Sequence, residues 1–176
     1  MSQVDVLALY QGIERDAFRL ETLQVYDVAA EADQVAAFLR GEPLPPSPGV
    51  DRSLRVIGEI TGSGRRLWRV HIVDVPLVGY LRYELAAYQK NAAAGEQVYL
   101  ADRAWHDDLA ILTEDFVLFD DQTVVWYRYD DAGGLLGHER DDSPASLVRC
   151  REARDLAVRW AVPLDEFPTT SSATMS

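Results

Sequence analysis

The residues of this chain that suit acid–base chemistry are one histidine and three carboxylates near its middle. A histidine changes charge near neutral pH and serves as a general acid or base, while a nearby carboxylate orients it or takes up a proton. This chemistry defines four candidate catalytic residues: His71, Glu84, Glu114 and Asp115. An arginine clamps anions and tyrosines contact ligands through ring and hydroxyl. The candidate ligand-binding residues are Tyr80, Arg82, Tyr83 and Tyr88.

The tyrosines have a second interpretation. Tyr80, Glu84 and Tyr88 share one face if their segment is a helix, because residues four apart lie above one another. Tyrosine and arginine are enriched at protein interfaces and suit polar pockets. Tyrosines also line the edge of a core with their hydroxyl groups in water, and the pattern favours this interpretation. Spacing alone does not show that these side chains converge.

The motifs of the common catalytic and metal centres are absent from the sequence. His71, His106 and His138 lie far apart, and no HExxH pair occurs. Cys150 is the only cysteine, which excludes an internal disulfide and a cysteine-rich metal site. No GxSxG elbow and no glycine-rich phosphate loop is present. We therefore predict no metal, no cofactor and no complete catalytic set.

The charge of the chain limits its partners. Its 176 residues include 17 Lys and Arg against 29 Asp and Glu, a formal net charge of −12. This charge disfavours direct binding to nucleic acid and favours a basic protein partner. No apolar run approaches the roughly 18 residues of a membrane span, and the first residues lack the basic segment of a signal peptide. We expect a cytoplasmic protein without membrane contact; a homodimer is left open.

The first third of the chain is predicted to alternate between helix and strand. Apolar spacings of three and four predict a helix over residues 4–20, before a short strand over 23–28 and a helix over 31–40. Residues 41–50 hold four prolines and form a stiff, extended connector. Asp51 suits the capping position of the next helix.

The middle of the chain predicts a parallel βαβ unit. Residues 67–75 alternate as a strand does, 78–94 have helical spacing and 97–101 form a second strand. Two strands joined by one helix over so short a stretch pair in parallel.

The last third predicts an antiparallel meander followed by a helix. Turn-forming residues separate strands at 115–119, 123–129 and 135–139, and Ser143–Pro144 opens a helix that ends at Trp160. The predicted fold is α/β, with a mixed, partly parallel sheet, a C-terminal antiparallel meander and helices on its faces.

One domain is predicted over residues 1–168. It comprises an N-terminal helical and strand segment (1–40), the proline-rich connector (41–50) and the main α/β core (51–168), and a flexible tail follows (169–176).

Several segments, taken in order, resemble the actinobacterial family DUF6879 over about residues 5–168. They are FRLET at 18–22, RVHIV with PL at 69–77, YLRYEL at 80–85, Asn91 with AGE at 94–96, and DFVLFDD at 115–121. The resemblance implies a small protein of streptomycetes and their relatives, encoded near helix-turn-helix regulators, with no established activity. Val117 stands where we expect a tryptophan.

A fainter similarity is to one half of a phospholipase-D-like domain. Active members carry an H-x-K-x(4)-D motif, whose histidine is the nucleophile. If Asp120 is the aspartate of that motif, Thr113 takes the place of the histidine and Asp115 that of the lysine. Without the histidine no phosphoenzyme forms. The resemblance therefore implies a shared fold without the hydrolase chemistry.

Charge and family resemblance lead to one functional hypothesis and two alternatives. We expect an acidic, non-catalytic interaction protein of an actinobacterial regulatory system, docking on a DNA-binding regulator of the helix-turn-helix type. The first alternative is a small-molecule enzyme of a biosynthetic pathway, with a polar pocket at the carboxyl ends of the parallel strands. There His71 is the acid or base and Arg82 clamps an anion. The second alternative is a ligand-sensing module that uses the same pocket without turnover.

Overall fold

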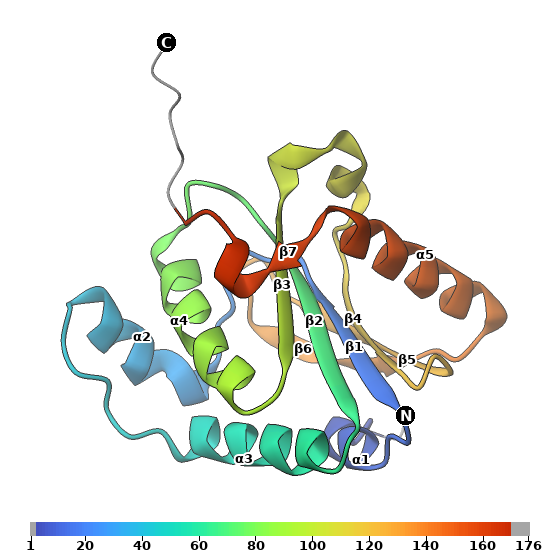
Figure 1. The fold of residues 1–176 in the computed structure, drawn as a ribbon, viewed down its shortest axis with the longest axis horizontal. Helices are drawn as coiled ribbons and strands as arrows, with labels where there is room; N and C mark the ends of the chain where they lie inside the picture. The colour runs from blue at the N-terminus through green and yellow to red at the C-terminus, as the bar shows by residue number, and fades with distance from the viewer. Residues whose placement is uncertain (1–2, 170–176) are drawn as a thin grey trace.

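The structure, a computed structural model, describes residues 3–169 and has a seven-stranded mixed sheet at its centre (Figure 1). The strands lie in the order β6-β5-β4-β1-β2-β3-β7. Their bounds are β1 (Asp16–Glu21), β2 (Arg66–Val73), β3 (Gln97–Asp102), β4 (Asp115–Phe119), β5 (Thr123–Tyr129), β6 (Leu135–Arg140) and β7 (Val162–Pro163). Strands β1, β2 and β3 pair in parallel, and the other pairings are antiparallel. The predicted mixed, partly parallel α/β fold with its meander is confirmed.

Helices cover both faces of the sheet (Figure 1). The α-helices are α1 (Val6–Gln11), α2 (Ala32–Leu39), α3 (Pro48–Gly62), α4 (Gly79–Ala93) and α5 (Pro144–Trp160). Short 3-10 helices are η1 (Ala29–Glu31), η2 (Arg103–Trp105), η3 (Asp107–Ile111) and η4 (Leu164–Glu166). Helix α5 lies on one side of the sheet, here the α5 face, and α2, α3 and α4 lie on the other, here the α4 face.

None of the helices within residues 3–169 has the length and apolar character needed to cross a membrane.

The βαβ unit forms as the pattern predicts. Helix α4 connects β2 to β3, which pair in parallel with Trp68 opposite Gln97. Gly95 ends the connection with a φ of 113°, a conformation that favours glycine. A Cβ atom there would also collide with the side chain of Thr61 on α3. This close approach holds α3 against the end of α4.

The predicted helix over residues 4–20 is wrong in its second half. Helix α1 ends at Gln11, and β1 begins at Asp16. Strand β1 lies inside the sheet between β4 and β2 and is paired along both edges. This pairing outweighs the helical spacing of its apolar residues. The predicted strand over 23–28 is also wrong, since this segment is irregular apart from a single bridge at Asp27.

The proline-rich connector ends earlier than predicted. Helix α3 begins at Pro48, inside the predicted range 41–50, and the hydroxyl of Ser47 accepts a 3.4 Å hydrogen bond from the amide of Val50. Ser47 is therefore the cap in place of Asp51, because proline suits the first helical position, where its missing N–H leaves no bond unmade. The predicted tail lies outside the described residues, apart from residue 169.

The two faces of the sheet differ in chemistry. The α5 face is a continuous apolar cluster that includes Phe18, Leu20, Val70, Ile72, Phe116, Leu118 and Trp126. The α4 face holds two apolar clusters, one around Leu81 and Leu100 and one around Ile60 and Val117. Buried charged side chains of β1 and β2 lie on that face as well, and they build the site described next.

Candidate functional site

Two neighbouring strands place four polar side chains on the α4 face. Arg19 and Glu21 alternate with apolar residues along β1, and Arg69 and His71 do so along β2. The parallel register sets Arg19 opposite Arg69 and Glu21 opposite His71. Two partly buried arginines are thus brought together on this face, where their charges favour a shared anion.

Glu21 supplies that anion. Its Oε1 lies 3.0 Å from Nη2 of Arg19, and its Oε2 lies 3.1 Å from Nη1 of Arg69. Burial alone would raise the pKa of Glu21, but the two guanidinium groups outweigh it and hold the pKa well below its usual range. Glu21 is therefore ionised at neutral pH.

Arg69 is held by a second carboxylate. Its Nε lies 2.6 Å from Oε1 of Glu96, the residue before β3. The side-chain amide of Asn91, on α4, donates a 2.9 Å hydrogen bond to the other oxygen of Glu96. The charges on this face therefore form a connected network that fixes the position of Glu21.

His71 is fully buried and lies against Tyr88 of α4. Its Nε2 is 2.6 Å from the carbonyl oxygen of Leu23, so we assign the ring proton to Nε2. Burial lowers the pKa of His71 although Glu21 opposes the shift, so the ring is neutral at pH 7. Its Nδ1 lies 2.8 Å from the hydroxyl oxygen of Tyr88, and that hydroxyl also donates to Glu21. One tyrosine proton thus faces two acceptors.

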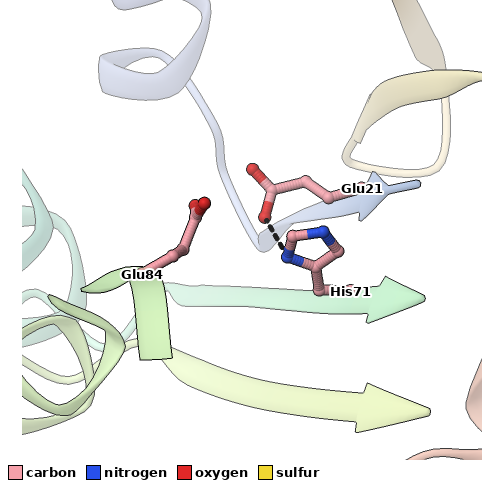
Figure 2. Close-up of side chains that lie close together, drawn as sticks. All are labelled: Glu21, His71 and Glu84. Atoms are coloured by element: carbon pink, nitrogen blue, oxygen red, sulfur yellow. Dashed lines mark ion pairs between the residues drawn. The ribbon is translucent and has the colours of Figure 1, made fainter. Parts of the chain in front are cut away.

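Glu84 is the unusual residue of the site. Figure 2 shows its carboxyl group pointing from α4 into the space that the Glu21 carboxylate also faces. The residue is 9% exposed, and within residues 3–169 its Oε2 has no hydrogen-bond partner. Burial, followed by repulsion from Glu21 and Glu31, raises the pKa of Glu84 to about 8. Glu84 is therefore a buried, uncharged acid at neutral pH.

Glu21, His71 and Glu84 are also residue types that bind metals. One ligand atom from each lies within 4.8 Å of the other two. However, both oxygens of Glu21 contact guanidinium groups, and Nδ1 of His71 contacts the Tyr88 hydroxyl. A metal ion would have to displace these partners against the repulsion of two arginines. The absence of a metal site stays a prediction.

Asp115 holds the loop that follows β1. Its carboxylate accepts hydrogen bonds from the amide and the hydroxyl of Thr22, at 2.8 and 2.6 Å, and from the hydroxyl of Tyr26, at 2.6 Å. Burial raises the pKa of Asp115, although these hydrogen bonds oppose the shift. The geometry assigns this candidate catalytic residue a positioning role.

A cavity of 340 Å³ lies between the α4 face of the sheet and helices α3 and α4. Its carboxylates are Glu21, Asp27, Glu31 and Glu84, and α3 adds the apolar side chains of Leu54 and Ile57. Tyrosine rings form much of the remaining wall: Tyr26, Tyr80, Tyr83, Tyr88, Tyr127 and Tyr129. Its volume is near the lower end of ligand pockets, roughly 300 to 1,000 Å³. The cavity extends over the α4 face of the sheet and includes Glu21, the last residue of β1.

A second cavity of 340 Å³ lies between α1, α3 and the sheet. Val6, Leu7 and Val56 contribute apolar wall, and Glu96, its carboxylate, is already paired with Arg69. The cavity that contains Glu84 is therefore the better candidate for a polar ligand.

Most candidate residues converge, but two do not. The buried residues on or beside the α4 face are His71, Tyr80, Tyr83, Glu84, Tyr88 and Asp115. Arg82 is exposed on the outer side of α4. Glu114 pairs at 2.8 Å with Arg128 and also with Arg149 of α5. Residues next to one another on a helix or strand point in different directions, which separates both from their neighbours in the site.

The tyrosine hydroxyls are not in water, contrary to the interpretation that they line the core edge. The hydroxyl of Tyr80 donates to Glu31, and that of Tyr83 donates to Gln34, each at 3.1 Å. These bonds attach α4 to η1 and α2, which close the cavity. The rings are therefore held in fixed orientations.

Sequence reasoning missed the charged centre of the site, Arg19, Glu21, Arg69 and Glu96. The signal was the alternation of charged and apolar residues over 17–21, which the predicted helix concealed. Once β1 is known to be an inner strand, two charged side chains on one of its faces indicate a buried polar site.

The positions aligned with the phospholipase D motif do not form a catalytic centre. Asp120 has a φ of 51°, and its carboxylate accepts hydrogen bonds of 2.7 to 3.0 Å from the amides of Glu14, Arg15 and Asp16. Thr113 is exposed, whereas Asp115 is buried. Asp120 therefore anchors the start of β1.

Comparison with solved structures defines the class of fold. The chain is similar to Nuc from Salmonella typhimurium, a phospholipase D family member, with 11% sequence identity and a TM-score of 0.54, covering 90% of this chain and 87% of that one. NucT from Helicobacter pylori has 9% identity and a TM-score of 0.49, with the same coverage. At such identity, the likeness to Nuc shows the fold alone, and this fold was the fainter similarity noted in the sequence.

The family follows from a second comparison. The model of DUF6879, a domain of unknown function, matches residues 4–169, so the chain belongs to this family. No curated protein matches the chain.

Proposed function

We propose that the protein binds a small polar molecule in the cavity beside α4, as a ligand-sensing module without turnover. The observation that carries this proposal is Glu84. Its carboxyl group lies on the wall of a 340 Å³ cavity, and its Oε2 is without a hydrogen bond from any described residue. A buried polar atom left in this state costs about 1 to 3 kcal/mol. A ligand that supplies the missing partner would recover that free energy.

The surrounding contacts favour binding over catalysis. Both ring nitrogens of His71 have close partners, and both oxygens of Glu21 contact arginines. A general base needs a free lone pair within reach of the substrate proton. The contacts fix the positions of these two side chains, which suits recognition.

The test is a thermal-shift screen of small polar metabolites at millimolar concentration. The wild type is compared with Glu84→Gln and with the control Glu114→Gln, which changes the same residue type on the α5 side. We expect at least one compound to raise the Tm of the wild type and the control, but not of Glu84→Gln. Mass spectrometry of the mixture should recover that compound unchanged.

Two outcomes would reject this function. If no compound raises the Tm of the wild type, or if every effective compound acts equally on Glu84→Gln, the cavity is not the binding site. Conversion of the compound would instead establish the enzyme alternative.

The charge of the chain supports a second proposal, docking on a basic partner. A net charge of −12 speeds the association of the protein with a basic surface. The electrostatic attraction between the two is strongest at low salt. We propose a DNA-binding regulator as that partner. A tagged pull-down from the native host should recover a regulator at low salt and lose it at high salt. Recovery of the protein alone under both conditions contradicts the docking role.

A further inference from the structure

We infer that the ligand is an organic ammonium ion, with its nitrogen at the carboxyl group of Glu84 and its carbon skeleton against the tyrosine rings. This inference rests on the proposed function and names its ligand class. It follows from the facing carboxyl groups, the lining of the cavity and the balance of charge around it.

The Glu84 carboxyl group lies close enough to Glu21 for the charge of Glu21 to stabilise a cation bound at Glu84. An oxygen of Glu84 and an oxygen of Glu21 lie within 4.8 Å of each other. A nitrogen hydrogen-bonded to Glu84 is therefore stabilised by the nearby charge of Glu21, whose own oxygens stay with Arg19 and Arg69. An ammonium group donates several hydrogen bonds, so it would satisfy the Oε2 of Glu84, which has no hydrogen-bond partner among residues 3–169.

Three of the cavity tyrosines have hydroxyl groups bonded to other side chains, which leaves their rings to contact a ligand. The hydroxyls of Tyr26, Tyr80 and Tyr83 are engaged by Asp115, Glu31 and Gln34. The ring of Tyr80 lies 6.1 Å from that of Tyr26 and 6.2 Å from that of Tyr83, measured between centroids. Aromatic faces attract cations and pack against carbon chains. A small ion such as a metal would use neither property, nor would it fill a cavity of 340 Å³.

Charged groups face Glu84 from several elements. They are Arg19 and Glu21 of β1, Arg69 of β2, Asp27 before η1, Glu31 of η1, Lys90 of α4 and Glu96 before β3, with His71 and the cavity tyrosines as neutral groups. With Glu84 ionised, the five carboxylates exceed the three cations by two charges. The surplus is negative, so the cavity favours a cationic ligand over a neutral or anionic one.

Binding should therefore be coupled to release of a proton. Free Glu84 is protonated at neutral pH, because its pKa is raised to about 8 by burial and by Glu21 and Glu31. An ammonium ion favours the carboxylate form and displaces that proton. The affinity should then rise about tenfold per pH unit below pH 8 and level off above it.

The experiment is isothermal titration calorimetry with probes matched in shape. The probes are phenethylamine, its neutral analogue 2-phenylethanol and its anionic analogue phenylacetate, with putrescine, choline and zinc chloride in parallel. Titrations at pH 6, 7 and 8 in two buffers of different ionisation heat give affinity and proton release. Glu84→Gln mimics the protonated acid in shape and charge, so it should fold, and circular dichroism checks this. Glu114→Gln is the matched control.

We expect at least one amine to bind the wild type and Glu114→Gln, with about one proton released and at least tenfold weaker binding to Glu84→Gln. For phenethylamine, the alcohol and the carboxylate should bind at least tenfold more weakly. Failure of every amine to bind overturns the inference, and so does tighter binding of the alcohol, the carboxylate or zinc. Binding of a neutral or anionic compound would preserve the proposed ligand-binding function, whereas failure of every compound in the metabolite screen would reject both.

Discussion

The two faces of the sheet reach stability by different means. On the α5 face, Phe116, Leu118 and Trp126 pack with Cys150 and Ala157 of α5 in one apolar cluster. On the α4 face, a network of arginines and glutamates lies on the same sheet as two apolar clusters. A buried ion pair is weak evidence for stability, because an apolar replacement is often as stable. The contrast indicates that the α5 face serves the fold, and that the α4 face retains its charges for another purpose.

The largest expected effect comes from removing the central anion of the α4 face. Glu21→Gln leaves Arg19 and Arg69 facing each other without their shared carboxylate and should lower the free energy of unfolding by about 3 to 5 kcal/mol. Leu20→Ala, one residue away on the α5 face, should cost about 2 to 5 kcal/mol. Urea denaturation at pH 7 measures both.

The stability losses of Glu21→Gln and Leu20→Ala should respond differently to low pH. The folded-state pKa of Glu21 lies below its ordinary value of 4.5, so its stabilisation is complete above that pH and is lost as the pH falls through the folded-state pKa. The gap between the wild type and Glu21→Gln should therefore narrow at pH 3. The gap for Leu20→Ala should change less, and equal behaviour of the two variants would contradict the contrast between the faces.

Replacing Glu84 should also change the free energy of unfolding, with a pH dependence opposite to that of Glu21. Its pKa is raised from 4.5 to about 8, so its contribution to stability is complete below pH 4.5 and is lost as the pH rises through 8. Relative to the wild type, Glu84→Gln should gain roughly 1 kcal/mol per pH unit over that window. Denaturation curves from pH 5 to 9 measure this difference, and a difference independent of pH would show that Glu84 is ionised throughout.

A smaller effect is expected at the tyrosine that connects Glu21 to His71. Tyr88→Phe removes the hydroxyl that contacts both residues and should cost about 1 to 3 kcal/mol. The matched control is Tyr99→Phe, whose ring packs against the apolar cluster of the α5 face and whose change should stay within about 0.5 kcal/mol. Equal losses in thermal denaturation would argue against the network.

The smallest change in stability is expected at Glu114, which lies outside the buried clusters of both faces. Glu114 is 34% exposed in its ion pair with Arg128, so water and salt screen the pair. Glu114→Gln should change stability by less than about 1 kcal/mol, and less still at high salt. A larger loss at high salt would mean that Glu114 also supports the packing of α5.

Local patterns in the sequence predicted much of the fold. The βαβ unit, the meander and α5 follow from alternation, turn residues and a Ser–Pro start, which are local properties of the chain. Strand β1 was missed because its apolar residues also have helical spacing, and only its pairing with β2 and β4 decides between the two.

The site was predictable only in part for the same reason. Glu84, Tyr80 and Tyr88 were found from residue type and spacing on one helix. Arg19 and Glu21 depend on β1, and the burial that raises the pKa of Glu84 depends on three elements meeting. No pattern within one segment contains that information.

The most direct test of this account is a carbon-13 NMR titration of the Glu84 side-chain carboxyl, assigned by its loss in Glu84→Gln. The account predicts a midpoint near pH 8 in the free protein and a midpoint shifted well below that when an amine is bound. A midpoint near the ordinary value of 4.5 in the free protein would mean that the α4 face holds no neutral acid, and the proposed ligand site would lose its basis.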